Sequence, residues 1–163
     1  MNWIESLLNG TSLAVLGASL AALLSGTGSA KGCGIAGEAA AGVLTEDPSK
    51  FGQTLLLQAL PGTQGIYGMI IAFLILLKIG IIGGNPSDIG ITTGLRLLFA
   101  ALPVGIVGLT SGIAQGRASA ASMGIIAKRP EELGKAMMYP AMVETYAVLS
   151  LLASFLIWLG IDV

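Results

Sequence analysis

The sequence has few of the residue types on which soluble domains and most enzymes depend. Its 163 residues contain no histidine, one cysteine and only 10% charged side chains, whereas a soluble domain is nearer a quarter charged. The absence of histidine excludes histidine-based acid–base catalysis and histidine metal sites, and a single cysteine cannot form an intramolecular disulfide. The formal net charge of −1 gives no indication of nucleic-acid binding.

Apolar residues dominate instead, at 54% of the chain, with a mean hydropathy of +0.86. They fall into four stretches separated by charged or turn-forming residues. We expect helices at about 7–45, 51–79, 89–127 and 131–161, each long enough to cross a bilayer. The predicted fold class is an all-α membrane protein with four transmembrane helices.

The second half of the chain repeats the first half. A shift of 82 residues pairs Pro48 with Pro130, and a shift of 86 pairs Ser25 with Ser111. The four-residue gap between the two shifts falls in the turn of each hairpin. The repeat therefore predicts two tandem-duplicated hairpins, residues 1–82 and residues 83–163.

Glu144 is the one acidic or basic side chain inside the apolar stretch 136–161. A carboxylate inside a spanning helix costs several kcal/mol on insertion scales, so its default interpretation is functional, with a partner nearby. The alternative is a protonated glutamate without a role. The repeat pairs Glu144 with Gly62, so only the second hairpin carries this carboxylate.

Small residues recur every four positions in two of the expected helices. The first of these helices has two rows and the third has one: Gly17, Ala21, Ser25, Ser29, Cys33, Gly37 and Ala41; Ala18, Ala22, Gly26, Ala30 and Gly34; and Gly108, Gly112, Gly116, Ala120 and Gly124. Such rows let helix backbones approach closely in lipid. They suit the inner wall of a ring of helices, and the alternative is tight packing within one bundle. The bulkier second and fourth helices suit an outer, lipid-facing wall.

Lysine and arginine gather toward the two short hairpin turns. Six of the eight lie on that side, namely Lys31, Lys50, Arg117, Lys128, Arg129 and Lys135, whereas Lys78 and Arg96 lie on the other. By the positive-inside rule we expect cytoplasmic turns and extracytoplasmic termini in a multi-pass cell-membrane protein.

Polar side chains of three helices fall at the depth of Glu144. Gln64, Gln115 and Glu144 all lie roughly 20 Å from the turns at 1.5 Å per residue, with Leu60, Thr63 and Tyr67 on adjacent turns. Pro61 cannot donate its N–H, and it frees a carbonyl about four residues earlier.

Carbonyl, hydroxyl and amide oxygens suit Na⁺, as in the broken helices of transporters. One carboxylate with a monovalent cation is net neutral, which removes the bare charge from the hydrocarbon. A proton needs only the carboxyl and one acceptor, so the surplus of neutral oxygens favours Na⁺ over H⁺. The alternative is that the amides and the hydroxyl only join the helices by hydrogen bonds.

Four segments together resemble the proteolipid, or K subunit, of bacterial V-type Na⁺-ATPases. They are SGTGSAKG (25–32), LPGTQGIYG (60–68), SGIAQG (111–116) and MVETYA (142–147). The resemblance implies a homo-oligomeric rotor ring in lipid, turned by ATP hydrolysis in a separate peripheral sector. It implies a Na⁺ site made by the Leu60 carbonyl, Thr63, Gln64, Gln115 and Glu144, with Tyr67 hydrogen-bonded to the glutamate.

The resemblance also implies partners and a role without catalysis. Each ring subunit carries an ion past a stator membrane subunit with an essential arginine, and we expect a central-stalk subunit at the cytoplasmic turns near Pro48 and Pro130. The chain has no GxxxxGK[ST] nucleotide motif, so we expect no chemistry of its own. Three alternatives stay open: an H⁺-carrying ring, a stand-alone transporter or channel, and a structural membrane protein whose glycine rows mediate oligomerisation.

Overall fold

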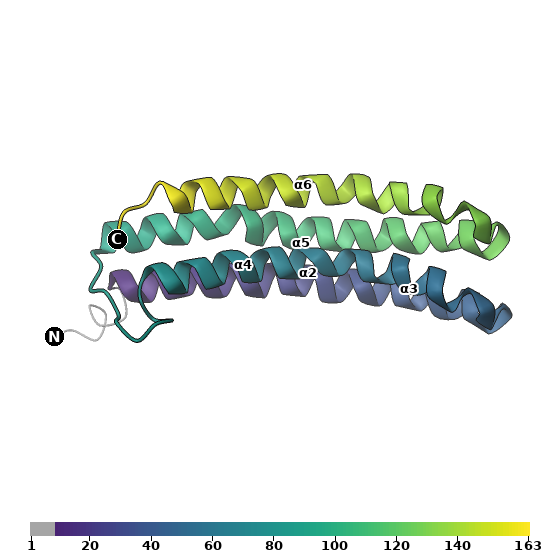
Figure 1. The fold of residues 1–163 in the computed structure, drawn as a ribbon, viewed down its shortest axis with the longest axis horizontal. Coiled ribbons are helices and arrows are strands. Elements are labelled where there is room, and N and C mark those ends of the chain that lie inside the picture. The colour runs from purple at the N-terminus through teal and green to yellow at the C-terminus, as the bar shows by residue number, and fades with distance from the viewer. Residues whose placement is uncertain (1–8) are drawn as a thin grey trace.

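The computed structural model describes residues 9–163, which form long helices lying side by side (Figure 1). In chain order the elements are α2 (Gly10–Glu46), η1 (Pro48–Lys50), α3 (Phe51–Ala59), η2 (Leu60–Gly62), α4 (Thr63–Lys78), α5 (Ile91–Lys128), η3 (Pro130–Glu132) and α6 (Leu133–Leu159). The residues described contain no strand. The prediction of an all-α protein is confirmed.

Within these residues four segments are long and apolar enough to cross a membrane: Gly10–Glu46, Pro48–Lys78, Ile91–Lys128 and Pro130–Leu159. This confirms the four expected transmembrane helices. The observed ends differ from the expected ones by a few residues at most where both are described, and positions 7 and 8 of the first expected helix lie outside the described residues. The second segment is interrupted by the 3₁₀ turn η2, because Pro61 cannot continue the α-helical hydrogen bonds.

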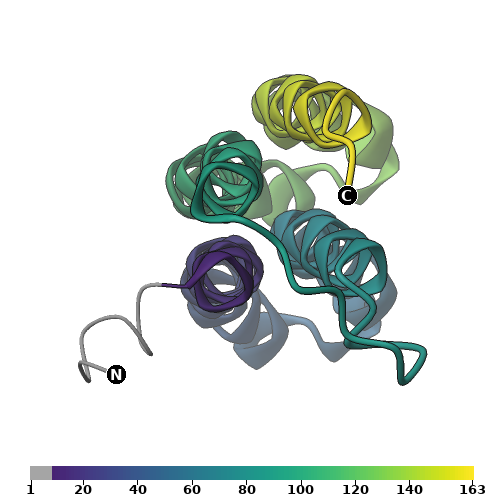
Figure 2. The ribbon, with the colours of Figure 1, turned by 90° about the vertical axis from the view of Figure 1, so that its left-hand side faces the viewer.

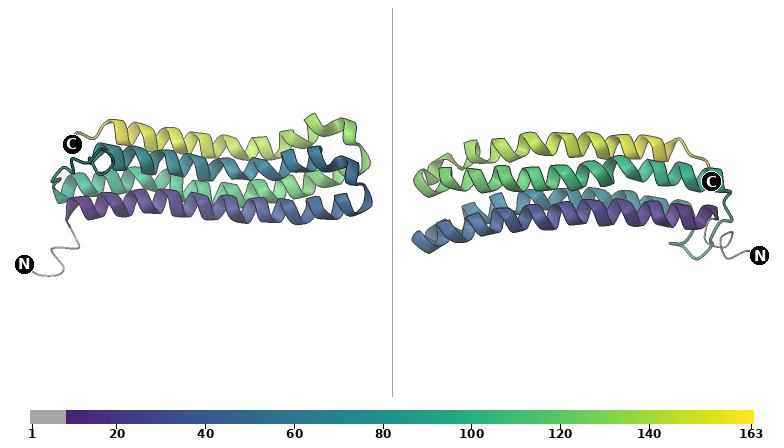
Figure 3. Two further views of the ribbon diagram at one scale, coloured as in Figure 1. Left: turned by 60° about the horizontal axis from the view of Figure 1, so that its bottom comes forward. Right: turned by 180° about the vertical axis from the view of Figure 1, so that it is seen from behind.

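The helices form two layers of two. Seen from the end, α2 and α5 lie on one side, while the α3–α4 segment and α6 lie on the other (Figure 2). The two tight turns, α2 to α3 and α5 to α6, share one end of the bundle, and the loop between α4 and α5 lies at the opposite end with the C-terminus (Figure 3). This arrangement brings three helices around Glu144.

Small residues bring α2 and α5 into backbone contact. A Cβ on Gly32 would overlap the carbonyl of Gly112, and a Cβ on Gly116 would overlap the backbone of Gly32. One turn away, a Cβ on Gly28 would meet Gly108 in the same way. The predicted row on α5 is therefore used inside the chain, against Gly28 and Gly32, which lie outside both predicted rows of α2. Helix backbones approach this closely only where side chains are absent.

The first tight turn is fixed by Asp47. Its carboxylate accepts hydrogen bonds from the Ser49 hydroxyl at 2.6 Å and the Ser49 N–H at 3.0 Å, and it lies 3.4 Å from the Lys50 ammonium. The hydrogen bonds from Ser49 hold the pKa of Asp47 below its ordinary value. Lys50 also donates to the carbonyl of Ala127 at 2.7 Å, which ties the two hairpin turns together.

Lys78 joins the hairpins at the opposite end. Its ammonium donates to the carbonyls of Trp158 at 2.6 Å and Ile161 at 2.5 Å, and it lies 4.3 Å from the centre of the Trp158 ring. The indole N–H of Trp158 donates in turn to the carbonyl of Leu74 at 3.2 Å. Each end of the bundle is thus closed by a lysine of the first hairpin that caps carbonyls of the second.

Gly112→Ala tests the α2–α5 contact. The added methyl would meet the backbone of Gly28 and Ser29, and forced overpacking costs about 1–3 kcal/mol. We expect a lower thermal midpoint for the detergent-solubilised protein. Gly52→Ala is the matched control, because a Cβ there meets nothing within 4 Å. Equal midpoints for the two variants would show that the close contact does not limit stability.

Candidate ion-binding site

The α3–α4 break places oxygen atoms at one point of the bundle. At η2 the Leu60 carbonyl accepts both the backbone N–H of Thr63 and the Thr63 hydroxyl, the latter at 3.1 Å. Pro61 is buried against Gly32 of α2, so this point of the chain cannot slide along the bundle. The break therefore sets the depth of Leu60, Thr63 and Gln64 together.

Ser29 supports the segment that follows the break. Its hydroxyl oxygen accepts the backbone N–H of Gly65 at 2.7 Å, and Ser29 itself is buried. The contact fixes the residue after Gln64 to helix α2. Sequence reasoning placed Ser29 only in a row of small residues. The repeat held a signal for it, because the shift of 86 pairs Ser29 with Gln115.

Two buried amides connect α4 to α6. The Gln64 side-chain N–H₂ donates to the Gln115 amide oxygen at 2.6 Å, and the Gln115 N–H₂ donates to the Glu144 carboxylate at 3.3 Å. Both glutamines are fully buried, at 0% exposure. Buried amides are costly unless they are hydrogen-bonded, so each depends on the other and on the carboxylate. The Thr63 hydroxyl lies 3.5 Å from the Gln64 amide oxygen, so polar contacts run from Thr63 through Gln64 and Gln115 to Glu144.

Tyr67 holds the other carboxylate oxygen. Its hydroxyl donates to Glu144 at 2.7 Å from helix α4. Glu144 is half-buried, so it faces the site on one side and the edge of the protein on the other. The two ion pairs found among residues 9–163 join Lys50 to Asp47 and Lys135 to Glu132, both near the tight turns. Within that range Glu144 has neutral hydrogen-bond donors and no cationic side chain.

The structure thus brings all six predicted site residues together. Leu60, Thr63, Gln64 and Tyr67 come from η2 and α4, Gln115 from α5 and Glu144 from α6, and the hydrogen bonds above link them. The described residues contain no group of three or more His, Cys, Asp or Glu side chains that could hold a metal ion. A cation here would meet one carboxylate and several neutral oxygens, a set that suits small hard cations of single charge.

Comparison with known families decides what kind of protein carries this arrangement. The family model for the C subunit of ATP synthase matches twice, at residues 16–75 and 98–157, which together make up more than half of the chain. The chain belongs to the ATP synthase C family. The two matches start 82 residues apart, which is the shift that the sequence repeat predicts.

Two relatives cover most of the chain. The V-type sodium ATPase subunit K of Enterococcus hirae is 49% identical over 160 residues, 98% of this chain and 99% of the relative. The A-type ATP synthase subunit K of Methanocaldococcus jannaschii is 41% identical over 150 residues, 91% of this chain and 63% of that relative. The resemblance found in the sequence is confirmed, as is the prediction of a non-catalytic membrane subunit.

Gln115→Leu tests the buried amides. The change leaves the Gln64 N–H₂ without its acceptor and Glu144 without one donor, and an unmet buried polar group costs about 1–3 kcal/mol. We expect the thermal midpoint to fall. The double variant Gln64→Leu/Gln115→Leu should recover part of the loss, because both amides are then gone. A double variant less stable than Gln115→Leu would show that the two amides act independently.

Proposed function

We propose that this chain is the rotor-ring subunit of a V-type ATPase that binds Na⁺ and moves it across the membrane. ATP hydrolysis in a separate peripheral sector drives the movement. The observation that carries the proposal is the set of neutral oxygens around a single intramembrane carboxylate, given by Leu60, Thr63, Gln64 and Gln115 around Glu144. The name of the Enterococcus hirae relative supports Na⁺ as the cargo.

Binding requires the Gln115 amide to turn, whereas the Gln64 oxygen already lies beside Thr63. The Gln64 N–H₂ now donates to the Gln115 oxygen, whereas a cation needs amide oxygens turned toward it. The nitrogen and oxygen of an amide exchange places by rotation about one terminal torsion. Thr63 can keep donating to Leu60 while its oxygen accepts the ion. Tyr67 keeps its hydrogen bond to the carboxylate and fixes the Glu144 rotamer.

The loaded site is neutral, and this neutrality permits rotation through lipid. An ionised carboxylate in hydrocarbon is too costly to carry around the ring, whereas Glu144 with Na⁺ has no net charge. At the stator membrane subunit, an arginine meets the unloaded Glu144 between two half-channels. Moving one charge through 100 mV takes about 2.3 kcal/mol, which ATP hydrolysis can supply several times over.

The proposal includes an orientation. Both tight turns, near Pro48 and Pro130, face the cytoplasm and contact a central-stalk subunit, and both termini are extracytoplasmic. The support is the excess of lysine and arginine toward the turns. The two turns also share one end of the bundle (Figure 1).

An H⁺-carrying ring is the second candidate. A proton needs only Glu144 and one acceptor, and the Tyr67 hydroxyl beside the carboxylate could serve a protonated acid equally well. The extra oxygens of Leu60, Thr63 and Gln64 would then have no role in transport. This difference makes the two candidates separable by experiment.

Glu144→Gln removes the charge and keeps the shape of the side chain. We expect the ring to assemble while Na⁺ transport and Na⁺-stimulated ATP hydrolysis are lost in the reconstituted complex. Asp88→Asn is the matched control, because Asp88 is an exposed carboxylate in the loop between α4 and α5, away from the site. Transport that survived in the Glu144 variant would refute the central role of this carboxylate.

Carbodiimide labelling separates Na⁺ from H⁺. The reagent attacks a protonated carboxyl, so Na⁺ on Glu144 should protect it, and the protecting concentration should rise as pH falls because ion and proton compete. Thr63→Ala or Gln115→Ala should raise that concentration roughly 5- to 150-fold, for about 1–3 kcal/mol per lost ligand. The exposed Thr110 on α5 provides the control, Thr110→Ala. Labelling unaffected by Na⁺ at every pH would favour the proton ring.

A further inference from the structure

We propose that a second copy of this chain docks head to tail on the first, in the register that α2 uses on α5 within one chain. The α2–α4 face of the second copy covers the α5–α6 face of the first. The inference deepens the proposed function, on which it rests, because it states which residues meet between neighbouring ring subunits. Four observations carry it.

The first observation is the repeat itself. Inside one chain, Gly32 of α2 packs between Gly112 and Gly116 of α5. The shift of 86 relates α2 to α5. At the interface between two copies, α5 of the first copy can therefore occupy the position that α2 has in the contact within one chain. In the same way, α2 of the second copy can occupy the position of α5. The same contact then sets Ala118 of the first copy between Gly26 and Ala30 of the second.

The second observation is a row of small residues left over on α2. Ala22, Gly26, Ala30 and Gly34 form it. A Cβ at Gly26 or Gly34 would meet nothing within 4 Å, and Ala30 is exposed. These are the positions that the repeat brings against the next copy. The α5 positions that would meet them, Ala114 and Ala118, are exposed and half-buried.

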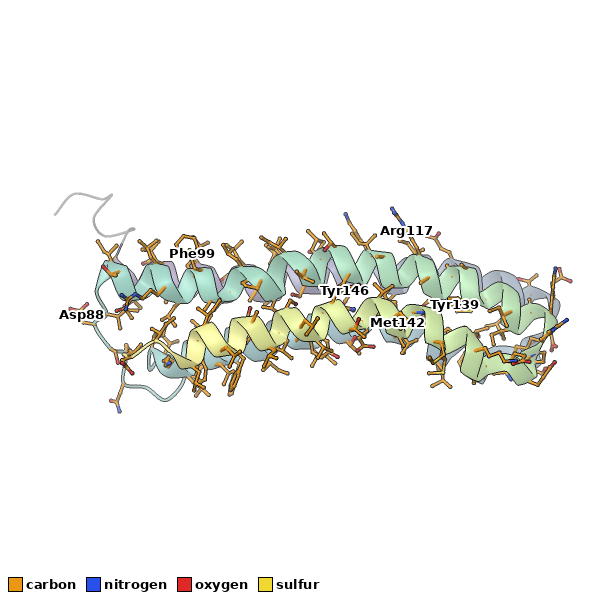
Figure 4. All side chains as sticks on the ribbon, turned by 90° about the horizontal axis from the view of Figure 1, so that it is seen from above. Asp88, Phe99, Arg117, Tyr139, Met142 and Tyr146 are labelled. Carbon is orange, nitrogen blue, oxygen red and sulfur yellow. The ribbon has the colours of Figure 1, made fainter. Side chains whose placement is uncertain are left out.

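The third observation is the fit of the outer helices. An apolar groove of about 550 Å³ runs along α4 from Gly62 past Ile66 and Phe73. On the opposite side of the protein, α6 carries large exposed side chains that include Met142, Tyr146 and Leu149, at 62%, 67% and 61% exposure. Figure 4 looks onto this side, with Met142 and Tyr146 on α6. Within one chain Tyr67 contacts Glu144. The 82-residue shift pairs Tyr67 with Leu149 and Glu144 with Gly62, so the equivalent contact between two copies places Leu149 of one copy over Gly62 of the next.

The fourth observation concerns charge at the tight turns. A cleft of about 570 Å³ lies between α5 and α6 and is lined by Lys128, Arg129 and Lys135. Glu132 also lines it, but its carboxylate is paired with Lys135 at 2.7 Å. The cleft therefore leaves Lys128 and Arg129 without an ion-pair partner among the described residues.

A second cleft, between α2 and α5, indicates which residues of the next copy should face the basic cleft. Ala39, Gly42 and Val43 of α2 line a cleft whose other wall is α5, including Gly124. The shift of 86 pairs those α2 residues with Ile125, Lys128 and Arg129, and all three of these line the basic cleft.

The same shift pairs Gly124 with Glu38, which is exposed on α2. Glu38 of the next copy is thus placed at the wall opposite Lys128. Opposite charges meet at the position where the repeat alone, without reference to charge, brings the two copies together.

Cysteine pairs test the register in the membrane-embedded protein with Cys33→Ala as background. Ala30→Cys/Ala118→Cys and Ala22→Cys/Ala114→Cys are in register, and oxidation should give a ladder of cross-linked oligomers in denaturing gels. A disulfide requires Cα atoms within about 7 Å. The exchanged pairs, Ala30→Cys/Ala114→Cys and Ala22→Cys/Ala118→Cys, use the same four substitutions displaced by one to two helical turns, and should stay monomeric.

The outcomes separate this proposal from the proposed function. Ladders only from the matched pairs support the register. Ladders from the exchanged pairs, or from none while the ring is intact by native electrophoresis, overturn it. If Na⁺ still protects Glu144 from carbodiimide in that case, the proposed function stands and only the interface is wrong.

Charge exchange tests the interface without cysteines, which matters if a cysteine variant fails to assemble. Glu38→Lys and Lys128→Glu should each lower the temperature at which the ring dissociates to monomers. The double variant Glu38→Lys/Lys128→Glu should raise this dissociation temperature most of the way back to that of the unchanged protein. Glu131→Lys, an exposed charge change outside the cleft, controls for net charge. Single variants without effect would overturn the pairing. A double variant no more stable than the less stable single variant would also overturn it, and this second result is expected if anionic lipid fills the cleft.

Discussion

The rest of the structure depends on a single carboxylate held inside an apolar helix. Glu144 costs several kcal/mol at this depth unless its charge is neutralised or hydrogen-bonded. The chain meets that cost with neutral groups, the hydroxyl of Tyr67 and the amide of Gln115, and with no cationic side chain among the described residues. A lysine or arginine in place of these donors would neutralise Glu144 permanently, and it could no longer exchange a cargo ion. Neutral donors lower the cost and keep the charge available.

Placing those donors requires helices that approach more closely than ordinary side chains permit. The contact of Gly32 with Gly112 and Gly116 draws α2 and α5 together. Gly32 also packs against Pro61 of the η2 break, and three residues earlier the Ser29 hydroxyl accepts the backbone N–H of Gly65, so α2 holds this segment of the second helix in place. The glycines therefore contribute to the site indirectly, because they fix the relative heights of α2, α4 and α5.

The sequence was sufficient for the membrane class, the helix number and the proximity of the six candidate site residues, because these depend on local signals. Apolar length, an isolated carboxylate and a repeat are visible in one dimension, and depth follows from a constant rise per residue. The hydrogen-bond order from Gln64 through Gln115 to Glu144 was not predictable, since it depends on rotamers that only the packed helices select. Ser29 was missed for a related reason: the repeat pairs it with Gln115, but the backbone N–H that its hydroxyl will face is set by the packing of α2 against α4. The cap made by Lys78 on Trp158 was missed too, because it joins residues 80 positions apart.

The duplication explains why one site serves four helices. At the position equivalent to Glu144 the first hairpin has Gly62, and at the position equivalent to Gln115 it has Ser29. Neither residue has a carboxylate that could neutralise a cation, but both keep a structural task, since Gly62 lies at the η2 break and Ser29 anchors Gly65. For a ring with a given number of helices, one carboxylate per two hairpins halves the charges moved in each turn. The same rotary work is then divided among fewer ions, so each can be moved against a larger membrane potential at about 2.3 kcal/mol per 100 mV. The absence of a second carboxylate thus favours steep gradients over large fluxes.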